Sequence, residues 1–416
     1  MYQTGSDARP DAGREWQEGD YSRPPNRLYT DPEIFDREMA RIFRGPGWAY
    51  VGLEAELPRA GDYLVTRIGD RSVIITRDAD GEIRGFVNRC AHRGVKLCRS
   101  ARGNSQFFVC PYHQWSYDAS GRLRGVPFVK GVKGLGGMPE DFRRADHDLP
   151  RLAVTRRNGV IFASFSHELP ALPDYLGQTN LHYFDRVFDG RGLRVLGYSR
   201  QLIPGNWKLM FENIKDPYHA SLLHVFLVTF GLFRADQPSQ VRMDESGAHA
   251  LLISRRGEQK RSADTRDIAN LKEDFVLRDP RLLDPVKEFP DDATVVMQTI
   301  WPNLIVQQQS NTLALRQIQP RHAGAFELAW TFFGYADDDE AMTLRRLRQA
   351  NLMSAAGLVS ADDSEVIKLA QDGLRGYPEE HGVVLMGGHG TGDEAHMVTE
   401  TAVRAFYRHY RTVMDL

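Results

Sequence analysis

The sequence predicts an α+β fold with two parts: an N-terminal all-β domain, and a C-terminal domain in which helices surround an antiparallel sheet. Residues 48–165 show short strand-like runs between tight-turn signals, which is typical of a small all-β domain. Beyond residue 166, strand-like runs are mixed with helical patterns. The predicted division is therefore a lead-in and helix over 1–47 that pack on the C-terminal domain, a β domain over 48–165, and a C-terminal domain over 166–416.

The composition is that of an ordinary globular protein. Of 416 residues, 42% are hydrophobic and 26% are charged, and the formal net charge is -2. This balance gives no sign of a nucleic acid or an anionic membrane as a partner. No apolar run reaches the roughly 18–20 residues of a membrane span, and the N-terminal residues lack the apolar core of a signal peptide. The three cysteines exclude a disulfide framework and suit a reducing compartment, so we expect a cytoplasmic protein.

The N-terminal segment is predicted to begin as an extended or partly disordered lead-in over 1–29 and to continue as a helix. Thr30 is the expected cap, and the acidic residues that follow suit the positive end of a helix. Four apolar residues then recur at helical spacing and form one face, namely Phe35, Met39, Ile42 and Phe43. We expect this face to pack on the C-terminal domain.

Turn chemistry divides the predicted β domain. Tyr63–Val65 and Val73–Ile75 are strand-like, while Asp78–Gly81 and Asp118–Gly121 indicate turns. The glycine-rich run Gly131–Gly137 follows no strand and lacks the spacing of a nucleotide site, so it is predicted to be a flexible loop.

The C-terminal domain is predicted to contain an antiparallel sheet. Its strand-like runs are Ala248–Ile253, Val295–Ile300, Leu304–Gln309, Leu313–Arg316 and Glu327–Phe333. A helix is predicted over 340–356, with the acidic run Asp337–Asp339 before it. The segment 255–288 is charged and irregular, and we expect it to be a mobile surface insertion near an entrance.

The strongest motif is Cys90-x-His92, followed after a gap by Cys110-x2-His113. A [2Fe-2S] cluster with two cysteines on one iron and two histidines on the other needs this ligand set, and histidine ligation raises its reduction potential. Tetrahedral zinc is the alternative, although its usual spacing pairs Cys with Cys and His with His. Trp115 follows the second pair and could shield a redox centre from water, whereas Cys98 is predicted to be a core thiol.

A second constellation reads Asp216-x2-His219-x4-His224. Two imidazoles and one carboxylate form the facial triad that leaves positions open on non-haem Fe(II). Five residues turn an ideal helix by roughly 140°, so both rings reach one metal only if the helix bends between His219 and His224. The alternative is a helical His pair that serves packing. A bound iron at this site would also distinguish an oxygenase from a pure electron-transfer protein.

The carboxylate ligand is expected far downstream, in the stretch Ser360–Glu365. The alternative for that stretch is a helix N-cap at Ser360 with acids in the first turn. Asp216 could itself be the ligand, and its spacing fits equally well with a carboxylate that orients an imidazole from behind.

These motifs, in this order, resemble the large subunit of Rieske non-haem iron aromatic-ring hydroxylating oxygenases. The resemblance rests on the cluster motif, on Asn206-Trp207-Lys208 with the His pair that follows, and on the late Asp362-Asp363 pair, and it covers nearly the whole chain. Within the family, the chain resembles the salicylate 5-hydroxylases in particular. The segments that carry this likeness are Asn213–His219, Phe230–Leu232, Arg234–Asp236, Arg348–Leu352, Val359–Asp363 and Met386–His389, with Tyr50–Glu54 and Gly125–Phe128.

The resemblance implies two sets of ligands. One Rieske [2Fe-2S] cluster is held by Cys90, His92, Cys110 and His113. One mononuclear Fe(II) is held by His219, His224 and Asp363, since the family uses the second Asp of the pair. Asp216 is implied to hydrogen-bond between an iron-ligand His and a cluster-ligand His of the neighbouring subunit in a trimer, which would be the electron path.

The resemblance also bears on the substrate. Arg316 matches the position of an arginine that is implied to clamp a substrate carboxylate in terephthalate relatives; the alternative is an inward Arg on a strand that forms only a structural ion pair. Those relatives carry a second Arg where this chain has Met397, which favours a monocarboxylate here. The run Ser354-Ala355-Ala356 departs from the Phe-Gly-Pro that is frequent in relatives just before the ligand helix.

The function implied is that of an oxygenase component that hydroxylates an aromatic carboxylic acid with O2 and electrons derived from NADH. Salicylate to gentisate is the expected reaction, and a ring dioxygenase for anthranilate, 2-halobenzoate or terephthalate is the alternative. NADH is expected to act only through a separate reductase, with a ferredoxin or the reductase's own iron–sulfur domain as the carrier. The expected assembly is a trimer, α3β3 with a small subunit, that binds neither nucleic acid nor membrane.

Overall fold

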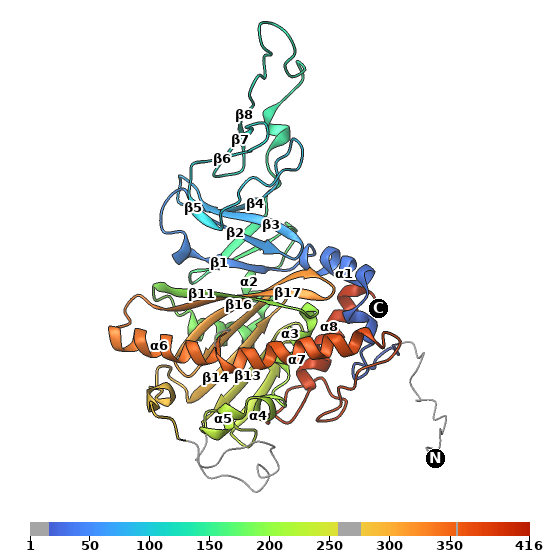
Figure 1. Cartoon of the computed structure of the whole chain (residues 1–416), viewed down its shortest axis with the longest axis vertical. Coiled ribbons are helices and arrows are strands. Elements are labelled where there is room, and N and C mark those ends of the chain that lie inside the picture. The colour runs from blue at the N-terminus through green and yellow to red at the C-terminus, as the bar shows by residue number, and fades with distance from the viewer. Residues whose placement is uncertain (1–15, 257–275, 355–356) are drawn as a thin grey trace.

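The structure is a computed structural model that describes residues 16–256, 276–354 and 357–416. Residues 1–15 of the lead-in predicted over 1–29, most of the predicted insertion over 255–288 and two residues of the Ser354–Ala356 run therefore lie outside the described residues. Among the described residues the strands form four sheets, which are stacked along the long axis of the molecule (Figure 1). The seven-stranded sheet is antiparallel throughout, as predicted for the C-terminal part.

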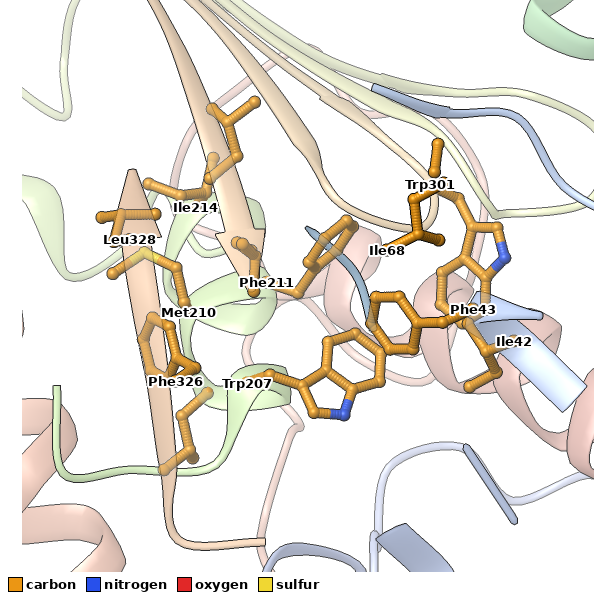
Figure 2. Packing of buried hydrophobic residues seen from close by; sticks show 14 of the residues in the cluster. Ile42, Phe43, Ile68, Trp207, Met210, Phe211, Ile214, Trp301, Phe326 and Leu328 are labelled. Carbon is orange, nitrogen blue, oxygen red and sulfur yellow. The ribbon is translucent and has the colours of Figure 1, made fainter. Parts of the chain in front are cut away.

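The N-terminal segment forms a 3-10 turn η1 (Asn26–Tyr29), helix α1 (Pro32–Glu38) and a π-helical turn η2 (Met39–Phe43). Asp31, not Thr30, caps α1, because its Oδ1 accepts hydrogen bonds from the backbone N–H groups of the first helical turn, and the predicted cap was wrong by one residue. The four apolar residues of the predicted face are buried in one core. That core includes Trp207 and Phe211 of the C-terminal part, and Phe43 lies edge-on to Trp207 (Figure 2).

Three small antiparallel sheets make up the predicted β domain. The first contains β1 (Ala49–Leu53), β10 (Val160–Ser164) and β9 (Ala153–Arg157). The second contains β4 (Ile83–Val87), β3 (Arg71–Arg77), β2 (Asp62–Ile68) and β5 (Arg102–Asn104). The third, at the tip, contains β6 (Phe107–Val109), β7 (Ser116–Asp118) and β8 (Leu123–Gly125). The loops after β4 and β6 carry the Cys and His motif. Short 3-10 turns η3 (Glu54–Glu56) and η4 (Arg144–His147) complete this part.

Both predicted aspartate turns are present. The Oδ1 atoms of Asp78 and Asp118 each accept hydrogen bonds from backbone N–H groups two and four residues later. Each turn then reaches a glycine at positive φ, Gly81 at 83° and Gly121 at 80°, a conformation in which a Cβ would be strained. The Gly131–Gly137 run is a loop, as predicted.

The large sheet has the strand order β11-β17-β16-β15-β14-β13-β12. Its strands are β11 (Leu193–Ile203), β12 (Ser239–Met243), β13 (Ala250–Arg255), β14 (Ala293–Ile300), β15 (Leu304–Gln309), β16 (Thr312–His322) and β17 (Ala325–Tyr335). The longer helices around it are α2 (Leu172–Val187), α6 (Glu340–Met353), α7 (Leu358–Arg375) and α8 (Thr401–Met414). The 3-10 turn η6 (Pro280–Leu283) lies in the segment predicted to be irregular.

Two helix starts bear on the sequence predictions. Asp339, the last residue of the acidic run that precedes the predicted helix, caps α6. Helix α7 begins at Leu358, with Gly357 as its N-cap, so the N-cap role considered for Ser360 is wrong. Asp362 and Asp363 therefore lie in the second turn of α7. They lie beyond the first turn, whose backbone N–H groups have no partner within the helix.

The register of the large sheet determines which side chains share a face. Arg316 on β16 lies opposite Ile305 on β15 and Trp330 on β17. Gln307 lies opposite Ala314 on β16 and Met297 on β14. Because paired residues in an antiparallel sheet point to the same side and alternate residues share a face, these side chains all project from one face.

Candidate active site

Helix α3 (Trp207–Lys215) leads into the site and is anchored by a buried polar cluster. Asn206 caps the helix by accepting a hydrogen bond from the Lys208 N–H at 3.0 Å. The Lys208 ammonium lies 2.5 Å from a carboxylate oxygen of Glu38 on α1, and both side chains are fully buried. Glu38 also accepts a hydrogen bond from the indole of Trp207 at 2.8 Å. The Asn-Trp-Lys motif thus fixes α3 to the N-terminal helix and sets the position where the chain leaves α3.

The helical conformation is interrupted twice between α3 and the helix α5 (Val225–Thr229). Asp216 ends α3, His219 precedes the single turn α4 (Ala220–Leu223), and His224 adopts non-helical angles (φ -88°, ψ 68°) before α5. The two imidazole rings lie 5.4 Å apart between centroids. The break that a shared metal requires is therefore present at His224.

Asp363 on α7 completes this group. Its Oδ1 lies 3.5 Å from Nε2 of His219 and 3.2 Å from Nε2 of His224. One ligand atom from each of the three residues lies within 4.8 Å of the others, a geometry that could hold a metal ion. The donor set of two imidazoles and one carboxylate fits non-haem Fe(II) with open positions.

The electrostatics favour a bound cation. Burial lowers the pKa of His219, but the carboxylates of Asp216 and Asp363 outweigh it and raise that pKa to about 10. Burial raises the pKa of Asp363, but the two histidines outweigh it and hold that pKa well below its usual range. A group of atoms that would hold a proton so firmly offers the same negative potential to a metal ion.

Asp216 and Asp362 lie behind the two imidazoles. Asp216 Oδ2 is 3.5 Å from Nδ1 of His219, and Asp362 Oδ2 is 3.4 Å from Nδ1 of His224. Since the Nε2 atoms face Asp363, both carboxylates stand on the side of each ring away from the ligand group. Asp216 also accepts backbone hydrogen bonds from Tyr218 at 2.8 Å and His219 at 3.3 Å. This arrangement suits orientation of an imidazole rather than ligation.

A cavity adjoins this group. Its walls are mostly apolar, and the sheet contributes Leu252, Val295, Met297, Gln307, Gln309 and Arg316. Helix α7 and the segment that runs from α3 to just beyond α5 contribute the three metal-site residues with Asn213, Asp216, Leu227, Phe233 and Val359. Met397, noted in the sequence as replacing an arginine, also lines it. We call this space the active-site cavity.

Among the described residues that line the active-site cavity, Arg316 is the one lysine or arginine. It is 3% exposed, its guanidinium lies 4.7 Å from the Trp330 ring centroid, and its Nε has no hydrogen-bond partner. Burial lowers its pKa to about 10, so it stays charged at neutral pH. A buried, charged and incompletely bonded guanidinium is matched to a planar anion such as a carboxylate.

Gln201 on β11 is a residue that the sequence motifs did not indicate. Its Oε1 accepts hydrogen bonds from the Trp330 indole at 3.0 Å and from Ser360 Oγ at 2.9 Å. Its Nε2 donates to Ser364 Oγ at 3.1 Å. Gln201 thus joins the ring that backs Arg316 to the two serines on either side of Asp363.

Replacing Gln201 with Leu is expected to loosen both the Trp330 ring behind Arg316 and the turn of α7 that carries Asp363. We expect roughly a 10-fold loss of iron affinity or activity and a higher KM for the aromatic acid, with Q201E restoring part of the loss because it keeps the acceptor. Iron per chain, KM and kcat should be measured against Q319L as a control, since Gln319 bonds to Thr66 and Gln317 away from the active-site cavity. If Q201L lowers only the melting temperature, Gln201 is structural and does not position the site.

The Cys and His motif forms two loops with one hydrogen-bond pattern. The N–H of Cys90 donates to Val95 O at 2.8 Å and Gly94 N–H donates back to Cys90 O, while Cys110 N–H donates to Trp115 O at 2.8 Å and Gln114 N–H donates back to Cys110 O. The positive φ needed near each loop end is 72° at Gly94 and 57° at Gln114. The loops therefore present both cysteines from equivalent positions.

The environment of these four residues fits a [2Fe-2S] cluster. Both cysteines are buried, and the hydroxyl of Tyr117 lies 3.4 Å from Cys90 Sγ, where it can tune a bound thiolate. Trp115 stacks on His92 with ring centroids 4.8 Å apart, and its shielding of the cluster from water stays a prediction. Cys98 is buried with its Sγ 3.5 Å from Ser100 O, in agreement with a core thiol.

Comparison with known proteins gives the class. Residues 176–416 match the family described as the ring hydroxylating alpha subunit (catalytic domain), and residues 47–136 match the Rieske [2Fe-2S] domain. Over 406 residues the chain is 50% identical to the large oxygenase component of salicylate 5-hydroxylase from Ralstonia sp, covering 96% of each. It is 42% identical over 411 residues to the large subunit of anthranilate 1,2-dioxygenase from Burkholderia cepacia, covering 98% of this chain and 97% of that one.

The fold agrees with that class. The structure of naphthalene 1,2-dioxygenase from Rhodococcus sp. bound to indole superposes with a TM-score of 0.78 at 26% identity, covering 94% of each chain. Fold and site together define a Rieske-type ring-hydroxylating oxygenase with one Rieske [2Fe-2S] cluster and one mononuclear iron. The chain belongs to the family of ring-hydroxylating oxygenase alpha subunits. The zinc-protein and pure electron-transfer alternatives are thereby excluded. No helix in the described part of the chain is long and apolar enough to cross a membrane.

Proposed function

We propose that this protein is the oxygenase component that hydroxylates salicylate at C5 to give gentisate, with O2 and electrons derived from NADH. The observation that carries the proposal is Arg316, a buried guanidinium with an unpaired Nε in a largely apolar cavity that also holds the three metal-site residues. An apolar wall suits an aromatic ring, and a single guanidinium suits a single carboxylate.

Two further points support a monocarboxylate. Met397 is buried and apolar where a second arginine would be needed to clamp a dicarboxylate such as terephthalate. The relative at 50% identity is a salicylate 5-hydroxylase component, compared with 42% for the terephthalate 1,2-dioxygenase alpha subunit of Comamonas sp.

We assign the ligands as the resemblance implied. Cys90, His92, Cys110 and His113 hold the [2Fe-2S] cluster, and His219, His224 and Asp363 hold the mononuclear Fe(II). When bound, the cluster supplies single electrons and the iron supplies O2 activation. The chain's own part is to fix the aromatic acid through Arg316, to exclude water from the ring with the apolar walls, and to hold the imidazoles of His219 and His224 through Asp216 and Asp362.

Asp216 is assigned to the path between cluster and iron. Strands β6–β8, whose first loop carries Cys110 and His113, lie at one end of the molecule, whereas the turn α4 beside His219 lies toward the other end (Figure 1). Electrons would therefore reach this iron from the cluster of a neighbouring subunit, which supports the predicted trimer, α3β3 if a small subunit takes part. A separate NADH-dependent reductase, with or without a ferredoxin, would supply the cluster. The domain bounds at 47/48 and 165/166 remain part of this proposal, as does a cytoplasmic location.

The test is a product assay. The purified holoprotein, reconstituted with an electron donor, is given salicylate under 18O2. Gentisate that carries one labelled oxygen is the expected product. Conversion of anthranilate to labelled catechol, with salicylate left unreacted, would instead favour the second candidate, an anthranilate dioxygenase. The 42% identity to the anthranilate 1,2-dioxygenase large subunit supports this candidate.

A further inference from the structure

A glutamine beside Arg316 has a buried hydrogen-bond acceptor without a donor. Gln307 lines the active-site cavity and is 2% exposed, and its Oε1 has no hydrogen-bond partner. Buried polar atoms are almost always paired, so an unpaired one at a cavity wall requires an explanation. Arg316 Nε, in the same cavity, is likewise unpaired. The two atoms offer complementary chemistry, an acceptor and a cationic donor.

The sheet register places these two side chains as diagonal neighbours. Gln307 on β15 lies opposite Ala314, and Arg316 is two residues further along β16 on the same face. Diagonal pairs of this kind lie roughly 7–8 Å apart, within reach of a small ligand that touches both. A carboxylate and a substituent on the next ring carbon are separated by less than that, so one benzoate can meet both side chains.

The orientation of the Gln307 amide is set by a neighbour. Its Nε2 donates to Gln309 Oε1 at 3.0 Å, which leaves Oε1 as the unpaired atom. Reversal of both amides together would present a donor instead, and would favour a substrate with an acceptor beside the carboxylate. The two arrangements therefore predict opposite substrate preferences.

We propose that Gln307 is a specificity residue whose Oε1 accepts a hydrogen bond from a donor group ortho to the substrate carboxylate. This inference rests on the proposed function, since it takes the carboxylate to lie at Arg316. The class of substrate is then a benzoate with an ortho hydroxyl or amino group. A halogen at that position has no hydrogen to donate, and an unsubstituted benzoate leaves the acceptor unpaired.

The same contact orients the ring. Arg316 fixes C1 through the carboxylate, and Gln307 fixes C2 through its hydroxyl, so the ring can no longer rotate about the C1–C4 axis. C5 is para to C2 and C4 is para to C1, so these two carbons lie furthest from the sheet, whereas C3 lies beside the held hydroxyl. The metal-site residues come from α7 and the segment around α4, not from the sheet. Hydroxylation at C5 rather than C3 follows from this orientation.

The test uses the holoprotein and a ligand series under anaerobic titration calorimetry. For the wild type we expect salicylate and anthranilate to bind roughly 10- to 100-fold more tightly than benzoate and 2-chlorobenzoate. In Q307M the affinity for salicylate should fall toward the affinity for benzoate. Turnover should then yield a mixture of 2,3- and 2,5-dihydroxybenzoate. Q308M is the matched control, because Gln308 is the next residue on β15 and points to the opposite face. It should keep the wild-type preference.

The outcomes separate the inference from the proposed function. Equal wild-type binding of salicylate and benzoate, tighter binding of 2-chlorobenzoate, or an unchanged preference in Q307M would each overturn the role of Gln307, even if gentisate is formed. The wild-type series needs no variant, so it decides the matter should Q307M not fold. Absence of gentisate would overturn the proposed reaction, while the binding series would still report on Gln307.

Discussion

Replacement of Asp216 with Asn is expected to stop turnover while both metal centres stay filled. The Asn side chain keeps an oxygen for the backbone N–H groups of Tyr218 and His219, so the turn before α4 should survive. It loses the second carboxylate oxygen, which lies 3.5 Å from His219 Nδ1, and with it the charge and an acceptor for an imidazole N–H. We expect activity to fall on the order of 100-fold or more.

The measurement follows the cluster directly. Iron per chain and the visible absorbance of the Rieske cluster should match the wild type, whereas a pre-reduced sample given salicylate and O2 should reoxidise its cluster far more slowly. D362N is a matched control, because Asp362 stands behind His224 at 3.4 Å just as Asp216 stands behind His219. A small effect in D362N with a large one in D216N identifies the electron path. Loss of iron from D216N would make Asp216 a ligand, and equal losses in both variants would reduce its role to imidazole orientation.

The two histidines of the metal site could be predicted because they lie close together in the sequence, in the motif Asp216-x2-His219-x4-His224. The five-residue step from His219 to His224 required a break in the helix, and the structure has that break at His224. Asp363 is distant in sequence, and only the family resemblance chose it over Asp216 and Asp362. The structure brings Asp363 alone of these three carboxylates into the ligand group.

Gln201 and Gln307 could not be predicted from motifs because their roles depend on strand register. A shift of one residue on β15 would turn Gln307 away from Arg316 and bring Gln308 toward it. A run of three glutamines in a strand that reads as buried was the available signal, since buried amides need partners. The cap of α1 was predicted one residue too early because Thr30 and Asp31 are adjacent and are both residue types that cap helices well.

Replacement of Arg316 with Met should remove the carboxylate clamp. We expect KM for salicylate to rise on the order of 100-fold or more, with a smaller change in kcat, because the guanidinium contributes mainly to binding. Steady-state kinetics with salicylate and a neutral analogue, salicylamide, provide the measurement. The neutral analogue should be affected far less than the acid. A wild-type KM for salicylate in R316M would show that the carboxylate lies elsewhere and would remove the main support for an aromatic acid as the substrate.

Arg316→Lys adds a test by pH. Burial lowers the pKa of Arg316 only to about 10, so wild-type binding should be flat between about pH 6 and 8. Lys215, whose ammonium touches Thr299 on the same face of the sheet, has its pKa lowered by burial to about 7. A lysine at 316 should be depressed similarly, so it is charged below neutral pH and loses its charge, and its hold on the carboxylate, as the pH rises. Salicylate affinity in R316K should therefore fall with increasing pH. If R316K binds salicylate with wild-type affinity at every pH, a single positive charge is sufficient, and the two-pronged hydrogen bonding of a guanidinium does not contribute.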